Sequence, residues 1–477
     1  MKKNIVHLMF LGASVMALNS CNDFLDREPL GVAIDGDLPV GGLEEKTFGL
    51  YSKMRTQDGV TNWNRYWFQS IRSDDAAKGS SAADASDIGA LLDDFQYSKT
   101  HYMGSNNWNG HYSLIYDCNY IVETVKNQNL TDAGSIVNDA EARAMRAFAY
   151  FDLRRDFGEV PLVLNIVDTP QDAIKAKSTI VEVDAQIKSD LEFAAANLPS
   201  TVLAQYTGRA TSGMTNSYLA KLALYQGNWA EALNKAEMVI NSGVYQLHGD
   251  YAKLFSEEGD NSKEVIWEVQ FARIASVNYS NNYWESQGIR GSGIWDLGWG
   301  FNVPTPNLLN AYEVGDKRKA GTVLTEGADD GYGLTLPTGL DQPNWNRKAY
   351  TTPSIRTSYG ENKNHWTNIK LMRYADVLLM AAEAAFQTGN VAKATTYLNM
   401  VRTRAGLPNT TATLTAIKQE RRVEFGMEGE RFYDLVRWGD AISVLASKGY
   451  QDKHKHFPIP QTAIDQAGGV LTQNPNY

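Results

Sequence analysis

Two stretches with one shared pattern decide the fold: YLAKLALYQGNWAEALNKAEMVINSG (Tyr218–Gly243) and DVLLMAAEAAFQTGNVAKATTYLNMVRTRAG (Asp376–Gly406). In each stretch an apolar periodic segment ends at a Gly-Asn pair, and a second periodic segment follows with alanines at matching positions. The apolar period is that of a helix, and glycine ends helices because it accepts the left-handed conformation. Each stretch therefore predicts a helical hairpin of the tetratricopeptide type.

The two predicted hairpins lie far apart in the chain, since Gly389 follows Gly227 by 162 positions (389 − 227). Such hairpins normally stack in tandem, so we expect the chain between them to hold a large insertion on a helical frame. The helical frame is assigned to residues of about 40–57, 107–270 and 369–450, and two loop-rich regions are assigned to about 58–106 and 271–368. Loops of this length are more often functional than idle.

Composition and charge limit the class of ligand. The 477 residues are 43% hydrophobic and 21% charged, which is typical of a globular protein. The formal net charge of −10 gives no basic field that would gather phosphates, so nucleic acid is not an expected partner. A neutral ligand fits this charge better than a polyanion.

The N-terminus has the pattern of an export signal. Lys2 and Lys3 precede an apolar run, Ile5–Leu18, that is too short to span a bilayer, and the sequence LNSC ends at Cys21. This pattern resembles a lipoprotein signal peptide over residues 1–20, with an acylated Cys21 as the membrane anchor of a single domain over 21–477. Ordinary secretion, with an unmodified Cys21, is the alternative. If Cys21 is acylated, Cys118, the other of the two cysteines, has no disulfide partner.

The chain carries none of the common metal, nucleotide or nucleophile motifs, so no cofactor and no metal site is expected. Adjacent carboxylates occur at Asp74/Asp75, Asp93/Asp94 and Asp329/Asp330. A glycosidase needs two carboxylates across the scissile bond, and adjacent residues do not provide that spacing by themselves. For the last two pairs we favour turns, because aspartate bonds the backbone of its own turn.

Aromatic residues concentrate in both loop-rich regions, above all in YSNNYWESQGIRGSGIWDLGWGF (Tyr279–Phe301). Flat rings beside polar side chains suit sugars, which present C–H faces ringed by hydroxyls. The candidate residues are Tyr283, Trp284, Trp295 and Trp299 with Asn281, Asn282 and Arg290, and Trp63, Tyr66 and Trp67 with Arg72, Asp74 and Asp75. The alternative is that these rings fasten the loops to the helices, since tryptophan is mostly buried. Trp108 falls in a helical register and is expected in the core.

Further distinctive segments include CNDFLDREPLG (Cys21–Gly31), IRSDDAAKG (Ile71–Gly79), LMRYADVLLMAAEA (Leu371–Ala384), ERRVEFGMEGERFYDLVRWG (Glu420–Gly439) and FPIPQTAIDQAGGVLTQNPNY (Phe457–Tyr477). Together these segments resemble the SusD/RagB family, the surface glycan-binding lipoproteins of Bacteroidetes-like bacteria, along essentially the whole chain. The fourth segment is rich in charge, and we expect its charges to pair with each other as part of the framework.

The resemblance implies a mainly α-helical fold with four tetratricopeptide-like hairpins and a loop-rich side with short strands that binds glycan. It also implies no enzymatic activity, a place on the outer membrane of a Gram-negative cell, and a SusC-like TonB-dependent transporter as partner. In relatives with the W-x4-R-S-D-D arrangement the tryptophan and the acidic pair lie at the binding surface, and they correspond here to Trp67, Arg72, Asp74 and Asp75. Two alternatives stay open: a surface glycoside hydrolase that uses Asp74 or Asp75, and a lipoprotein that binds peptides in its hairpin grooves, whose aromatics would be buried.

Overall fold

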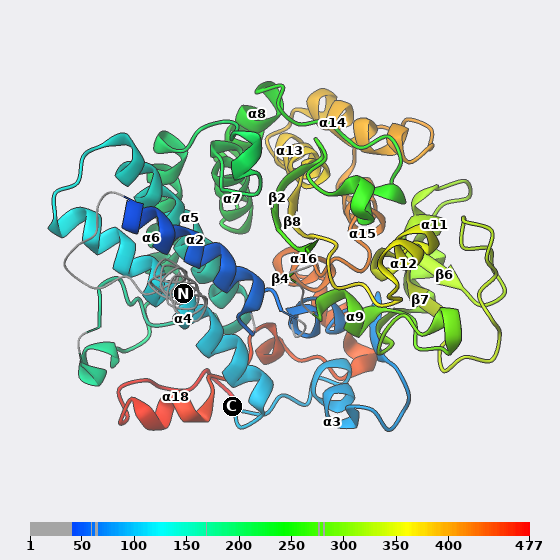
Figure 1. Cartoon of the computed structure of the whole chain (residues 1–477), viewed down its shortest axis with the longest axis horizontal. Helices are drawn as coiled ribbons and strands as arrows, with labels where there is room; N and C mark the ends of the chain where they lie inside the picture. Colours follow the sequence, from blue (N-terminus) through cyan, green and yellow to red (C-terminus); the bar gives the residue numbers. More distant parts are fainter. Residues whose placement is uncertain (1–40, 59, 63–64, 168, 275–276, 280–281) are drawn as a thin grey trace, which may run out of the picture.

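The computed structural model describes residues 41–477 except 59, 63–64, 168, 275–276 and 280–281 (Figure 1). The expected signal peptide, its Cys21, and the candidates Trp63 and Asn281 therefore lie outside the described residues. No helix among the described residues has the length and apolar character needed to cross a membrane.

The frame consists of eight helices that pack side by side. They are α2 (Gly41–Thr56), α4 (Tyr102–Asn127), α5 (Ala133–Phe157), α6 (Ile180–Asn197), α7 (Ser212–Tyr225), α8 (Trp229–Asn241), α13 (Tyr374–Gln387) and α14 (Val391–Arg404). Neighbours in this order contact each other from α4 to α14, and α2 lies against α4 and α5 (Figure 1). Taken two at a time, these helices form the four hairpin-like pairs of a mainly α-helical fold. The predicted hairpins are α7/α8 and α13/α14, and they stack because α8 packs on α13.

The repeated Gly-Asn pair builds the turn of both predicted hairpins. Gly227 and Gly389 have φ values of +69° and +82°, which favour glycine. The asparagine after each glycine caps the next helix: Asn228 Oδ1 accepts the N–H of Glu231 at 3.4 Å, and Asn390 Oδ1 accepts that of Lys393 at 3.1 Å. The two short sequence motifs therefore have the same local structure.

The described residues form four two-stranded antiparallel sheets, and all but the β3–β4 pair join segments that lie apart in the chain. Their strands are β1 (Ala76–Gly79) with β5 (Phe301–Pro304), β2 (Val265–Val269) with β8 (Ile369–Arg373), β3 (Ala272–Ile274) with β4 (Val277–Tyr279), and β6 (Val323–Thr325) with β7 (Asn344–Asn346). The β1–β5 pair brings the two loop-rich regions together, and the β2–β8 pair closes the base of the second region on the frame. In Figure 1 the loop-rich side lies at the right.

Short helices fill the rest of the chain. The α-helical ones are α3 (Ser86–Ile88), α9 (Tyr283–Gln287), α10 (Pro306–Ala311), α11 (Arg318–Thr322), α12 (Pro353–Tyr359), α15 (Leu414–Glu424), α16 (Arg431–Trp438), α17 (Ala441–Val444) and α18 (Gln461–Gln466). Two π-helical turns are η1 (Trp67–Ile71) and η2 (Gly89–Asp93). The 3-10 turns are η3 (Pro170–Ala173), η4 (Ala204–Tyr206), η5 (Lys253–Phe255), η6 (Glu257–Gly259), η7 (Gly293–Trp295), η8 (Arg347–Ala349), η9 (Ala446–Lys448) and η10 (Asp452–Lys455).

The charged segment Glu420–Gly439 forms a buried ionic network. Within the segment Arg421 pairs with Asp434 at 2.9 Å, but it also pairs with Asp376 of α13 at 2.8 Å. Most of the other charged groups of the segment pair with side chains from elsewhere in the chain, as Glu424 does with Arg373 at 3.0 Å. The expectation that the segment pairs mainly with itself is therefore wrong. It belongs to the framework because it ties the frame to the loop-rich side.

Candidate functional site

Asp74 and Asp75 lie between η1 and β1, where two arginines close over them. Arg431 of α16 donates to Asp74 at 2.8 and 3.0 Å. Arg422 of α15 donates to Asp75 at 2.8 and 2.6 Å and to Asp74 at 3.0 Å. Burial acts to raise the pKa of Asp74, but the hydrogen bonds and charges of Arg431 and Arg422 outweigh it and lower that pKa. Asp74 is therefore a paired carboxylate.

Both carboxylates are buried, with 8% of Asp74 and 1% of Asp75 exposed. Two acids and two guanidinium groups balance in charge, and they use each other as hydrogen-bond partners. A glycosidic bond has no access between them. The expectation that Asp74 and Asp75 contact a ligand at the surface is thus corrected: the pair clamps the loop to α15 and α16.

Arg72 is fully buried and serves the same framework. Its guanidinium lies 4.2 Å from the ring centroid of Phe432 and 4.5 Å from that of Phe457. Its Nη2 donates to Asp156 at 2.7 Å and to the hydroxyl of Tyr433 at 3.1 Å. A guanidinium with rings on both sides and an acid at its end has no face left for a ligand, so the expectation for Arg72 is also corrected.

The aromatic residues of the two loop-rich regions meet, but they meet inside the protein. Trp67 is 1% exposed, with its ring centroid 4.8 Å from that of Phe301. Tyr66 lies edge-on to Tyr283 at 5.9 Å. These contacts form part of one core cluster that continues into the frame. The expectation of a surface platform at Trp67 and Tyr283 is wrong, because the rings fasten the loops to the helices.

Trp284 and Trp295 are buried as well, each with 6% of its surface exposed. The indole of Trp284 donates to the carbonyl of Thr367 at 2.9 Å. Trp295 belongs to a second core cluster under the loop-rich side, where it packs with Trp345 and Tyr350. These two tryptophans therefore hold the second loop-rich region together, and their assignment as ligand contacts is corrected too.

Trp299 differs from the other predicted tryptophans whose side chains the structure describes, because its ring is only partly buried. Its indole N–H donates to Glu285 Oε1 at 3.2 Å. Glu285 in turn lies 3.2 Å from Lys363 Nζ. Trp299 thus has a fixed orientation and a ring that keeps contact with solvent.

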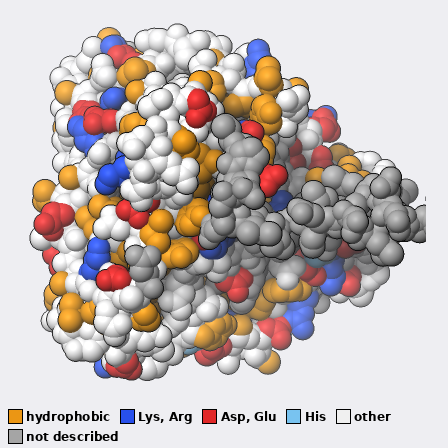
Figure 2. Space-filling model, turned by 60° about the vertical axis from the view of Figure 1, so that its left-hand side comes forward, with side chains coloured by type: hydrophobic (Ala, Val, Ile, Leu, Met, Phe, Trp, Pro, Cys, Tyr) orange, Lys and Arg blue, Asp and Glu red, His pale blue; other side chains and the backbone are white. Residues whose placement is uncertain are grey.

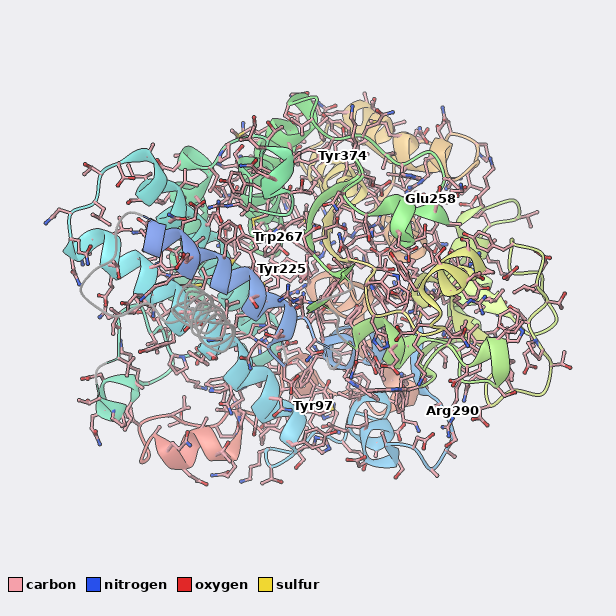
Figure 3. All side chains as sticks on the ribbon, in the orientation of Figure 1. Tyr97, Tyr225, Glu258, Trp267, Arg290 and Tyr374 are labelled. Atoms are coloured by element: carbon pink, nitrogen blue, oxygen red, sulfur yellow. The ribbon has the colours of Figure 1, made fainter. Side chains whose placement is uncertain are left out.

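An exposed polar surface lies next to Trp299, and we call it the Arg290 surface. Arg290 is among the loops at the lower right of Figure 3, and 40% of its side chain is exposed. It pairs with Asp84, and its Nε lies 3.7 Å from Asp341. The Arg290 surface consists of Asp84, Arg290, Trp299, Asp341 and Gln342, and the buried Ser80 bonds Arg290 and Gln342 from below.

Ser80 organises this surface. Its hydroxyl accepts from Arg290 Nη1 at 2.8 Å and donates to the carbonyl of Trp299 at 2.8 Å. Its own carbonyl accepts from Gln342 Nε2 at 2.7 Å. Three segments of the chain, around residues 80, 290–300 and 342, therefore meet at one serine.

Two glycines permit this meeting. Gly79 and Gly300 have φ values of +75° and +80°. A Cβ on Gly79 would lie 2.6 Å from the Gly300 oxygen, and a Cβ on Gly300 would lie 2.8 Å from Arg290 Cβ. Only glycine allows so close an approach at these positions. Arg290 and Trp299 are predicted from the sequence, whereas Ser80, Asp84, Asp341 and Gln342 are not. These residues come together only through long-range contacts, such as the β1–β5 pair and the bond of Gln342 to Ser80.

The Arg290 surface offers a guanidinium, two carboxylates, an amide and part of an indole ring within a small area. These groups can donate to and accept from hydroxyls while the ring contacts an apolar face. No group of three acidic, histidine or cysteine side chains suited to a metal occurs in the part of the chain that the structure describes. The arrangement is suited to binding a polyhydroxylated ligand.

Two family models match the chain. One, described as the SusD family, matches residues 263–477, and the other, described as starch-binding associating with outer membrane, matches residues 45–224. The chain belongs to the SusD family.

Its SusD-like relatives match over 73–97% of this chain. SusD-like protein P2 of Formosa agariphila is 26% identical, with 97% of this chain and 98% of the relative covered. Starch-binding protein SusD of Bacteroides thetaiotaomicron is 24% identical, with 73% and 74% covered. Among solved structures, a laminarin-binding SusD-like protein has 28% identity and a TM-score of 0.79, covering 92% of this chain and 99% of its own. Surface glycan-binding protein A from Bacteroides thetaiotaomicron, in complex with laminarihexaose, has 26% identity and a TM-score of 0.76, with 92% and 99% covered.

Proposed function

We propose that this SusD-family protein is a non-catalytic glycan-binding protein of the cell surface, and that the Arg290 surface is where the glycan binds. The observation that carries this proposal is the likeness in fold over 92% of the chain to structures named for laminarin and surface glycan binding. Among the predicted aromatic side chains that the structure describes around this surface, Trp299 is partly exposed and supplies the ring. Arg290, Asp84 and Asp341 supply the polar contacts.

A neutral glycan fits this surface best. The negative charges of Asp84 and Asp341 exceed the positive charge of Arg290, and the whole chain has a net charge of −10. The frame side, which Figure 2 brings forward, likewise presents no basic field, because acidic and basic side chains are interspersed on it. One partly exposed ring and a few polar contacts correspond to affinities from about millimolar to micromolar. Binding of that strength allows a captured glycan to be released again.

The burial of Asp74 and Asp75 supports a binding role over a hydrolase. Hydrolysis needs two carboxylates on either side of an open bond, and this pair is closed by Arg422 and Arg431. The peptide-binding alternative has one observation in its favour, since the loop aromatics are buried as it requires. A groove of about 780 Å³ beside α14, next to Tyr245 and Tyr374, is where a peptide would bind.

The proposal includes a place and a partner. Cys21, once acylated, would anchor the mature chain on the outer membrane, and a SusC-like TonB-dependent transporter would receive the glycan. Both follow from family membership together with the lipoprotein pattern at Cys21. Labelling of the full chain with radioactive palmitate, compared with a Cys21→Ala variant, tests the anchor, and co-purification of a transporter with the full chain tests the partner.

Migration of the soluble form, residues 22–477, in native gels that contain laminarin, starch or an acidic polysaccharide tests the binding proposal. We expect retardation by a neutral polysaccharide, with no reducing sugar released on long incubation. Release of reducing sugar would establish the hydrolase. Unchanged migration in every gel would favour the peptide-binding alternative.

A further inference from the structure

A cavity of about 660 Å³ lies away from the Arg290 surface, between α4, the segment 161–175 and the C-terminal α18. In Figure 1 α18 lies below α4 at the lower left, whereas the loop-rich side lies at the right. The volume is in the range of small-molecule sites, about 300–1,000 Å³. No lining residue of the cavity belongs to the Arg290 surface.

Trp108 forms one wall of this cavity. The residue is 6% exposed and lies edge-on to Phe157 at 5.1 Å, so the expectation that it packs in the core is met on that side. Its indole nitrogen has no hydrogen-bond partner among the described residues, yet it is not among the nitrogen atoms sealed from solvent. A buried indole usually finds a partner for its N–H. Here the indole N–H keeps access to solvent, so it can bond water or an acceptor on a ligand.

Two tyrosines extend the aromatic wall along α4. Tyr112 lies 4.9 Å from Trp108 between ring centroids, and its hydroxyl donates to the carbonyl of Pro161 at 2.8 Å. Tyr116, one turn further along α4, is 45% exposed. Three rings therefore line one side of the cavity, with one of them open to solvent.

Free polar groups surround the rings. Asn109, Gln171 and Gln466 line the cavity, and their amides make no hydrogen bond to any described residue. Lys175 is the charged residue among the described lining residues, which include no aspartate or glutamate. All three amides belong to exposed residues, so they can exchange water for the hydroxyl groups of a ligand that lies on the rings. A ligand with hydroxyl groups would satisfy them.

We infer that this cavity is a second binding site, which takes a short stretch of sugar rings. The C–H faces of the sugar would lie on Trp108, Tyr112 and Tyr116, and its hydroxyls would bond the amides of Asn109, Gln171 and Gln466. The choice of a sugar as ligand rests on the proposed function, whereas the cavity itself is defined by its lining residues. Two sites on one protein would hold a long polysaccharide more tightly than either site alone.

Hydrogen–deuterium exchange of the mature chain, with and without laminarihexaose or maltohexaose, tests this site. A sugar concentration of up to about 10 mM is high enough to detect millimolar binding. We expect at least one of the two sugars to slow exchange in segments 161–175 and 463–471. A Tyr116→Ala/Gln466→Ala variant should weaken this protection about three- to tenfold. Tyr102→Ala is the matched control, because Tyr102 is a similarly exposed tyrosine of α4 that does not line the cavity.

Absence of protection at these two segments with both sugars would overturn the inference, and so would protection that the double variant leaves unchanged. Protection by octyl glucoside but not by methyl glucoside would also overturn it, since the apolar chain would then be the occupant. Failure of the proposed function is a separate outcome. For the Arg290 surface it would appear as unchanged exchange around residues 284–300 and 339–347, whether or not segments 161–175 and 463–471 are protected.

Discussion

Arg422 holds Asp75 by two hydrogen bonds of 2.8 and 2.6 Å, in a place where the acid is 1% exposed. The contact joins α15 to the loop just before β1, two parts of the chain that lie 347 positions apart. A charge pair this buried serves the fold, and removal of one partner leaves the other charge without compensation.

Replacement of Asp75 by alanine should therefore lower stability and not act on ligand binding directly. We expect a loss of about 3 kcal/mol in the free energy of unfolding, measured by urea denaturation. Asp94→Ala is the control, since Asp94 is an exposed member of a similar acidic pair and should change stability by less than about 0.5 kcal/mol. A stable Asp75→Ala protein with lost polysaccharide binding would show instead that Asp75 contacts the ligand.

Trp67 is a buried aromatic residue that, like Asp75, should serve the stability of the fold. Its ring is 1% exposed between Tyr66 and Phe301, so Trp67→Ala should open a cavity and cost about 3–5 kcal/mol. Thermal unfolding followed by circular dichroism measures this loss. Trp67→Phe should recover part of it. If Trp67→Ala kept the melting temperature of the unmodified protein, the ring could not be part of the core.

Acid should destabilise the protein through His454. Burial among aromatic rings, together with the charge of Lys453, lowers the pKa of His454 to about 4. Between pH 4 and about 6.5 the unfolded chain binds a proton at this ring that the folded protein does not bind. Stability should consequently fall as the pH falls through this range, by about 1 kcal/mol after allowance for solvent screening.

Urea denaturation at pH 7 and pH 5 measures this effect as a difference within each protein. His454→Asn should show a smaller difference between the two pH values than the unmodified protein. His101→Asn is the control, because His101 lies nearer the surface beside Asp87 at 3.0 Å. An equal difference in all three proteins would remove His454 as the cause.

The frame could be predicted from the sequence because its signals are local. Helical period and the Gly-Asn pairs fix both hairpins, and Gly227 and Gly389 adopt the conformation that their place in the pattern requires. The candidate site was predicted only in part. Composition places Trp67 and Trp299 in the same class, and only long-range packing separates the buried ring from the partly exposed one.

The same dependence on long-range packing explains why the roles of the acidic residues were predicted wrongly or not at all. Asp74 and Asp75 looked available in the sequence because their partners, Arg422 and Arg431, come from the other end of the chain. The sequence predicts no role for Asp84 and Asp341, since no local pattern marks them as neighbours of Arg290. Residue types predict the kind of chemistry, whereas pairing between distant segments decides which residues can perform it.

Affinity electrophoresis of the unmodified mature chain and of the Arg290→Ala and Trp299→Ala variants tests the central claim most directly. In the polysaccharide that retards the unmodified protein, each variant should bind about five- to thirtyfold more weakly, which corresponds to about 1–2 kcal/mol. Phe48→Ala, which removes an exposed ring from α2, should migrate like the unmodified protein. Unchanged retardation of both site variants, with all proteins folded, would contradict the assignment of the Arg290 surface as the glycan-binding site.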